Sequence, residues 1–269
     1  MSTVTEFADI RLSSDDDRAC NEARRQYTEL LDQNLDWTSL TKSQEDQMKS
    51  VVKTFRAGAN KGHALSQHSL AVVCSAGHGI RQDVNEAYKL WVKAAQKGQV
   101  KSMESLAQLL YTGRKSVKPD HTQAAKWWIM AAEAGSARSQ HNLGSLYQNG
   151  QGVLKDRTAA VAWFQRSANQ GFPEAQFALA QYHEHGLGGL PKSRAIALEF
   201  YSIAAAKEYP QAQQHLERLS ARAESDATQA TAEMDTENGR RQSIAVTTSM
   251  SNDRTSNASS LANEGGVLL

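Results

Sequence analysis

The chain is poor in cysteine and in net charge, and each shortage excludes a class of protein. Its 269 residues include two cysteines, Cys20 and Cys74, which lie far apart in different kinds of segment. Two isolated cysteines form neither a disulfide framework nor a zinc site. The formal net charge is +1, whereas a nucleic-acid-binding protein needs a basic stripe. We therefore expect no nucleic-acid partner.

Long apolar runs are also missing. No stretch of about 18 apolar residues occurs in the sequence, so we expect no membrane span. The segment 1–17 is polar and acidic and lacks the apolar core of a secretory signal. Hydrophobic residues still make up 40% of the chain, which is enough for a packed core. These features together predict a cytoplasmic protein.

What the chain does contain is a segment that repeats four times. The repeats are marked by glycines that are spaced 36, 37 and 36 residues apart, Gly62, Gly98, Gly135 and Gly171. Each glycine is followed after eight residues by a leucine and after fifteen residues by a second glycine, and a pair of small residues precedes the next unit. Self-similarity at a fixed period is typical of a stacked array, in which each unit buries its apolar face against its neighbours. Such arrays usually bind other molecules rather than catalyse reactions.

Each unit reads as two helices, most clearly in the third repeat. The stretch 137–149 has apolar residues at helical spacing, and Gly150 and Gly152 permit a tight turn after it. Asp156 is placed to cap a second helix. Small residues such as Gly144 let the two helices approach closely. The sequence thus predicts an all-α fold, a right-handed α-solenoid of antiparallel helix pairs.

The same reasoning divides the whole chain into segments. Ser43 and Asp46 resemble a capping box at the start of a leading helix. Beyond Ser225 the composition becomes rich in Ser, Thr, Ala and Asn without a helical period, which predicts disorder. The predicted segments are an N-terminal tail and helix (1–40), a leading capping helix (41–61), four full repeats (62–97, 98–134, 135–170 and 171–207), a C-terminal capping helix (208–225) and a disordered tail (226–269).

The third repeat combines loop glycines, small residues and an aromatic pair in a recognisable order: Leu143, Gly144, Tyr147, Gly150, Gly152, Val153, Asp156, Ala160, Trp163, Phe164, Ala168 and Gly171. This combination resembles the Sel-1-like repeat (SLR), a relative of the tetratricopeptide repeat, and the resemblance covers about residues 62–216. The other units drift, with Cys74 and His183 at the position of Tyr147. The resemblance implies an adaptor or scaffold, as in endoplasmic-reticulum quality control, cell-wall synthesis, mitochondrial assembly or bacterial signalling.

The resemblance also implies where a protein partner would bind. Related arrays bind peptides on a concave face that is lined by the first helix of each unit. Carried over by position, the candidate partner-binding residues are Lys101, Glu104, Gln108, Tyr111, Arg138, His141, Ser145, Gln148, Glu174, Phe177, Gln181, His185, Gln211, Gln214 and Arg218. Their mixture of charges, amides and aromatic rings suits an extended peptide, because its backbone needs hydrogen-bond partners while aromatic anchors supply most of the energy. The basic-and-asparagine clamp of chaperone-binding tetratricopeptide domains is not visible at matching positions, which disfavours a heat-shock chaperone tail.

Three apparent signals of chemistry have structural interpretations. The stretch 186–193 nearly fits a phosphate-binding loop, but Pro191 removes an amide donor and a helix rather than a strand precedes it. His183 and His185 point in different directions on a helix, so they do not suit one metal ion. Cys74 is interpreted as a small buried hydrophobe. We therefore expect no enzyme activity, no cofactor and no metal.

One candidate modification site lies in the predicted tail. Arg240 and Arg241 precede Ser243 in the pattern of a basophilic kinase substrate, and phosphorylation would add about −2 charge there. Our interpretation is a non-enzymatic interaction scaffold that holds a partner peptide in its concave groove. Two alternatives stay open: a regulatory or activator subunit of an enzyme complex that is controlled through the tail, and an adaptor in endoplasmic-reticulum quality control.

Overall fold

Helices account for nearly all regular structure. The computed structural model describes residues 14–114 and 116–261, and within them strand pairing is limited to an isolated bridge between Arg114 and Val117. The helices of these ranges are α1 (Ser14–Asp32), α2 (Lys42–Asn60), α3 (Ala64–Ala76), α4 (Val84–Gln96), α5 (Val100–Thr112), α6 (His121–Glu133), α7 (Ala137–Asn149), α8 (Arg157–Asn169), α9 (Pro173–His185), α10 (Arg194–Ala205) and α11 (Pro210–Leu261).

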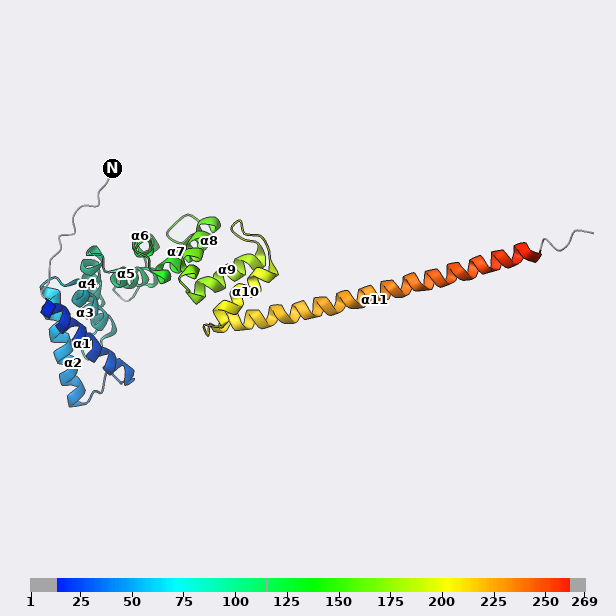
Figure 1. The fold of residues 1–269 in the computed structure, drawn as a ribbon. Coiled ribbons are helices and arrows are strands. Elements are labelled where there is room, and N and C mark those ends of the chain that lie inside the picture. Colours follow the sequence, from blue (N-terminus) through cyan, green and yellow to red (C-terminus); the bar gives the residue numbers. More distant parts are fainter. Residues whose placement is uncertain (1–13, 115, 262–269) are drawn as a thin grey trace, which may run out of the picture.

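The helices stack in sequence order (Figure 1). Each one packs against the next, from α1 on α2 to α10 on α11, and α1 also contacts α3. The repeats are the pairs α3/α4, α5/α6, α7/α8 and α9/α10, with α1 and α2 at the N-terminal end. The predicted all-α solenoid is therefore confirmed. In the third unit, α7 and α8 begin and end where the sequence predicts.

The second helix of every unit begins at a side-chain cap. Asp156 accepts the backbone N–H of Ala159 at 3.0 Å, as predicted. The other three second helices start in the same way: the side chains of Asp83, Asp120 and Ser193 each accept a hydrogen bond from the backbone N–H three residues further along the chain. Each cap satisfies one of the N–H groups that a helix start leaves unpaired. The fourth repeat therefore keeps the turn although a serine replaces the aspartate.

The leading helix starts earlier than the sequence predicts. The capping box consists of Thr41 and Gln44: the Thr41 side chain accepts the backbone N–H of Gln44, and the Gln44 side chain accepts that of Thr41 at 3.0 Å. The predicted box of Ser43 and Asp46 is wrong, since both residues already lie inside α2. A glutamine serves at the third helical position as well as a glutamate does, and an aspartate is too short.

Two glycines let neighbouring elements approach closely. A Cβ on Gly144 would lie 2.7 Å from the ring of Phe164, so α7 and α8 pack where no side chain fits. A Cβ on Gly152 would lie 2.1 Å from the carbonyl oxygen of His121, at the start of α6 in the preceding unit. Gly152 also has φ +72°, which L side chains rarely adopt. The loop of the third unit is therefore docked on the second unit through its glycine.

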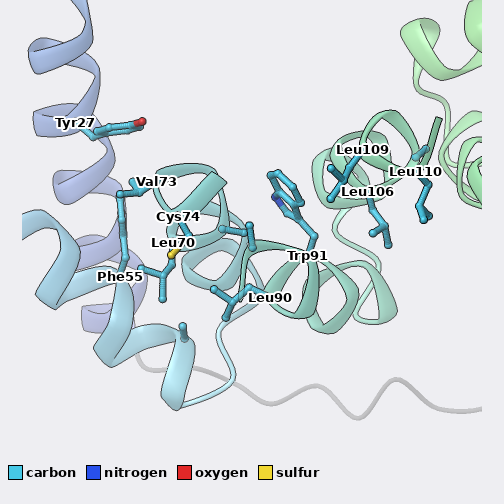
Figure 2. Close-up of a cluster of buried hydrophobic side chains, with 14 of the residues drawn as sticks. Tyr27, Phe55, Leu70, Val73, Cys74, Leu90, Trp91, Leu106, Leu109 and Leu110 are labelled. Carbon is cyan, nitrogen blue, oxygen red and sulfur yellow. The ribbon is translucent and has the colours of Figure 1, made fainter. Parts of the chain in front are cut away.

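An apolar core runs from α1 into α7 without a break (Figure 2). Its members are almost fully buried and include Leu30, Phe55, Trp91 and Leu143. Figure 2 shows Trp91 of α4 directed toward the helix that carries Leu106 and Leu109. Each unit thus buries its apolar face between its neighbours, which is the packing expected of an array.

Buried glutamines brace the junctions between units. The side-chain amide of Gln140 donates to the carbonyl oxygen of Ala132 at 3.0 Å, across the turn that joins α6 to α7. The corresponding bonds in the first and fourth units run from Gln67 to Ala59 and from Gln176 to Ala168. These glutamines are no more than 6% exposed, so their bonds satisfy carbonyl groups that water cannot reach.

The C-terminal segment differs from the prediction. Instead of a capping helix that ends at Ser225 and a disordered tail over 226–269, α11 continues without interruption to Leu261. Residues 262–269 lie outside the described residues, as do residues 1–13 at the N-terminus. Figure 1 shows α11 leaving the solenoid as a long, straight helix.

Local interactions explain why the part of this segment whose side chains the structure describes is helical although those side chains are not buried. From Thr228 to Arg241, every side chain that the structure describes is exposed. Pairs one turn apart support the helix, with Gln229 Nε2 3.0 Å from Glu233 Oε1 and Arg241 Nη2 2.7 Å from Glu237 Oε1. Ala, Gln, Glu and Arg are also strong helix formers. The lack of periodic apolar residues is an argument against packing on a core, but it is not an argument against a helix.

Candidate functional site

Residues of three first helices, α3, α5 and α7, line one pocket, which runs along α5. The pocket has a volume of about 280 Å³. Its polar walls belong to α5 and α7 and include Glu104, Ser105, Gln108, Arg138 and Asn142. We call it the α5 pocket. Three of the predicted partner-binding residues, Glu104, Gln108 and Arg138, therefore lie together in it.

The most deeply buried residues of the pocket lining are apolar and mostly aromatic, and we call them the floor of the α5 pocket. They are Trp91 of α4, in the first unit, and Leu109 of α5 and Trp128 of α6, in the second unit. All three are almost fully buried. Among the described residues, the indole N–H of Trp91 is buried and has no hydrogen-bond partner. A buried donor without a partner costs about 1–3 kcal/mol.

The charged groups of the α5 pocket are unequally paired. Glu104 is 11% exposed, and both of its oxygens are occupied, by Lys101 Nζ at 3.0 Å and by the hydroxyl of Ser136. Arg114, in the loop after α5, donates from Nη1 to the carbonyl oxygen of Ser75 at 3.2 Å. Within the ranges that the structure describes, neither Arg114 nor Arg138 has an ion pair. Two guanidinium groups thus line the pocket without a carboxylate partner.

Further along the same face, predicted residues lie between neighbouring helices. His141 of α7 is half-buried against Phe164 and Phe172, and burial lowers its pKa. Its Nδ1 and the Oε2 of Glu174 on α9 are buried and have no hydrogen-bond partner among the described residues. Tyr111 stacks on His121 and donates its hydroxyl to Gln151 Oε1 at 3.0 Å, so it joins the second and third units.

At the C-terminal end, two predicted residues hold α11 in place. Arg218 of α11 donates from Nη2 to Glu184 Oε1 at 2.6 Å, and the hydroxyl of Tyr201 donates to Glu184 Oε2 at 2.8 Å. Burial is the main cause that raises the pKa of Tyr201, and the bond to Glu184 adds to it. Phe177 packs its ring against Tyr201 and Tyr209. Phe177 and Arg218 therefore stabilise the end of the array.

The remaining predicted residues are less engaged. Ser145 donates its hydroxyl to the carbonyl oxygen of His141 within α7. Gln148 and Gln181 are half-buried, whereas His185, Gln211 and Gln214 are exposed. Ser243 lies within α11, and its side chain is outside the described residues.

Sequence reasoning missed several residues of this face. Glu184 follows its boundary glycine by thirteen residues, as Tyr111 and Gln148 follow theirs, so strict counting would have selected it instead of His185. Asn142 is adjacent in sequence to a predicted position, and the candidate set was too narrow to include it. Arg114 lies in a loop, and no periodic signal marks it.

The structure also joins an aspartate, a histidine and a serine that no sequence pattern connects. His63 Nε2 lies 2.9 Å from Asp17 Oδ1, and its Nδ1 lies 2.8 Å from Ser66 Oγ. Ser66 is 1% exposed, and a Cβ on Gly58 would lie 2.3 Å from its Oγ. A nucleophile needs access to its substrate, so this buried group serves to hold α1 against α3.

In residues 14–114 and 116–261, no three His, Cys, Asp or Glu side chains come together in a way that could hold a metal ion. In the same ranges, no helix combines the length and apolar character that a membrane span requires. His183 stacks on Phe200, which is the packing role expected for that position.

Stacked helix pairs with a polar recess on the first-helix face define the chain as an α-solenoid repeat protein. The Sel1 repeat matches residues 64–99, 100–136, 137–172 and 173–209, within about two residues of the repeat boundaries that the helices show. The chain therefore belongs to the Sel1 repeat family. No curated protein sequence matches it significantly.

Solved structures agree with this assignment. One similar structure is c5321, a protective antigen of uropathogenic Escherichia coli with an SLR fold, at 26% identity and a TM-score of 0.65 over 75% of this chain. The match spans 40% of that antigen. Another is a Sel1 repeat protein from Oxalobacter formigenes, at 27% identity and a TM-score of 0.61, covering 76% of this chain and 78% of that protein.

Proposed function

We propose that this chain is a non-enzymatic scaffold that holds a segment of a partner protein along the face formed by α3, α5, α7 and α9. The observation that supports the proposal best is the α5 pocket, because the predicted residues Glu104, Gln108 and Arg138 meet there over an apolar floor. Sel1 repeat proteins are generally protein-interaction scaffolds, which agrees with this proposal. Pockets of this kind, with an apolar base and a polar rim, are where interface residues contribute most binding energy.

Predicted polar residues extend this surface beyond the pocket. Gln148 of α7 and Gln181 of α9, on the next two first helices, are half-buried rather than buried. An extended peptide carries a backbone donor and an acceptor at each residue, and these two side-chain amides could pair with them. The face thus offers hydrogen bonds for a peptide backbone and a pocket for one of its side chains.

The test is cross-linking in native cells followed by mass spectrometry of the captured partners. The groove variant is Gln108→Glu with Arg138→Glu. The matched control is Gln123→Glu with Lys126→Glu on α6, which makes the same change in charge at exposed positions of a second helix. We expect partners to be lost with the groove variant and kept with the control, while circular dichroism of both stays helical. A partner set that is the same for both variants would contradict the proposal.

A second candidate function is regulation of an enzyme complex through the C-terminal segment. It is favoured by the exposure of every side chain that the structure describes between Thr228 and Arg241 of α11. Modification of Ser243 by a basophilic kinase belongs to this proposal. Deletion of 226–269 should then remove partners that the groove variant retains. Retention of every partner after this deletion would reject it.

A further inference from the structure

We infer that the α5 pocket selects an acidic side chain of the bound partner segment, held by Arg114 and Arg138 and flanked by an apolar neighbour on the tryptophan floor. This inference rests on the proposed scaffold function and specifies the chemistry of the segment that the scaffold would hold. The occupant is therefore a peptide segment with an aspartate or glutamate next to an apolar residue.

The first argument is the balance of charge. Glu104 is the carboxylate of the pocket wall, and Lys101 and Ser136 already occupy its two oxygens. Lys101 therefore already balances its charge, and Arg114 and Arg138 have no ion pair within the described ranges. A carboxylate from outside the chain would complete the pairing.

The second argument is the balance of hydrogen-bond donors. A guanidinium group has five N–H donors and no acceptor, and Arg114 uses one of these donors in its hydrogen bond to the carbonyl oxygen of Ser75. The amides of Gln108 and Asn142 add donors on the same walls. An ionised carboxylate only accepts hydrogen bonds, and Arg binds it with two parallel bonds. The free groups of the pocket therefore complement a carboxylate better than a cation or an amide.

The third argument is the floor. Trp91, Leu109 and Trp128 are the most deeply buried residues of the pocket lining, whereas Arg114 and Arg138 are exposed. An apolar side chain on this floor would exclude water from the neighbouring ion pairs, and ion pairs are stronger where water is excluded. Acidic and apolar side chains that are adjacent in the partner segment would use both parts of the pocket at once.

The test uses the full chain and a displayed library of random peptides as the probe. We expect selected peptides to share an acidic residue beside an apolar one. A fluorescein-labelled copy of a selected peptide should bind about tenfold more weakly when its acidic residue is replaced by the amide, which corresponds to about 1.4 kcal/mol. Arg138→Gln should remove this difference between the acid and amide peptides, whereas Lys126→Gln on α6 should preserve it.

The outcomes separate this inference from the scaffold proposal. If selected peptides lose binding with Gln108→Glu and Arg138→Glu but show no preference for an acid, the scaffold proposal stands and the inference fails. If binding is unaffected by both pocket changes, both fail. A library that yields no binding peptide also overturns the inference. Arg114→Gln provides a second variant, and it should act in the same direction as Arg138→Gln.

Discussion

Replacement of Gly152 by alanine should destabilise the array through two separate effects. The residue has φ +72°, and the left-handed region costs an L residue about 1–2 kcal/mol. The new Cβ would also lie 2.1 Å from the carbonyl oxygen of His121 and 2.9 Å from the backbone nitrogen of Thr122. These are backbone atoms at the start of α6 and cannot rotate away, so overpacking adds about 1–3 kcal/mol. We expect a total loss of about 2–5 kcal/mol.

A matched glycine isolates the contribution of the contact. Gly135 has φ +93°, and a Cβ added there would meet no atom within 4 Å, so Gly135→Ala should show the backbone strain alone, about 1–2 kcal/mol. Urea unfolding followed by circular dichroism would compare the two variants with the parent chain. Midpoints and slopes should both be compared, because repeat arrays do not always unfold in a single step. A midpoint for Gly152→Ala that is no lower than that of Gly135→Ala would refute the reasoning.

Three further predictions concern pH, the C-terminal helix and its attachment. Burial lowers the pKa of His68 from 6.5 to about 4, so the unfolded chain takes up the proton first and stability is lost as pH falls through this window. The loss at pH 5 should reach up to about 2 kcal/mol and should shrink in His68→Gln, as thermal unfolding against pH would show. Deletion after Ser225 should leave the unfolding midpoint of the repeats unchanged, because the side chains described between Thr228 and Arg241 are all exposed; a lower midpoint would reveal packing against the solenoid. Arg218→Ala should cost about 1 kcal/mol, since Glu184 loses its charged partner, and should speed amide hydrogen exchange in the first turns of α11; unchanged exchange would show that apolar contacts alone hold that helix.

The repeat fold could be predicted from the sequence because the same structural signals recur in each of the four repeats. The glycines at the unit boundaries, the caps such as Asp156 and the small residues such as Gly144 all recur at one period, so an error in one unit is corrected by the others. The α2 capping box and the length of α11 had no such redundancy. Helix formation beyond Ser225 depends on local propensity and on pairs such as Gln229 with Glu233, which an argument based on burial does not count.

The candidate site was predictable only in part. Position within the repeat identified Glu104, Gln108 and Arg138, because a helix face follows from spacing. It did not show that Arg114 reaches the same pocket from a loop, or that Trp91 forms part of the floor with an unpaired indole N–H. Those facts depend on packing between units. Spacing also could not separate binding residues from bracing residues: Phe177 of α9 packs against Tyr201 of α10, and Arg218 of α11 pairs with Glu184 of α9.

The length of α11 fixes a distance that a flexible tail would not. Its 52 residues extend about 78 Å at about 1.5 Å per residue. A coil of the same length would let its far end fold back, and a group there would reach the α5 pocket at a high effective concentration. A straight helix prevents this return. The helix would therefore act as a rigid spacer between a molecule bound near Leu261 and a peptide bound in the pocket. Each would bind with its own affinity, and neither would compete with the other.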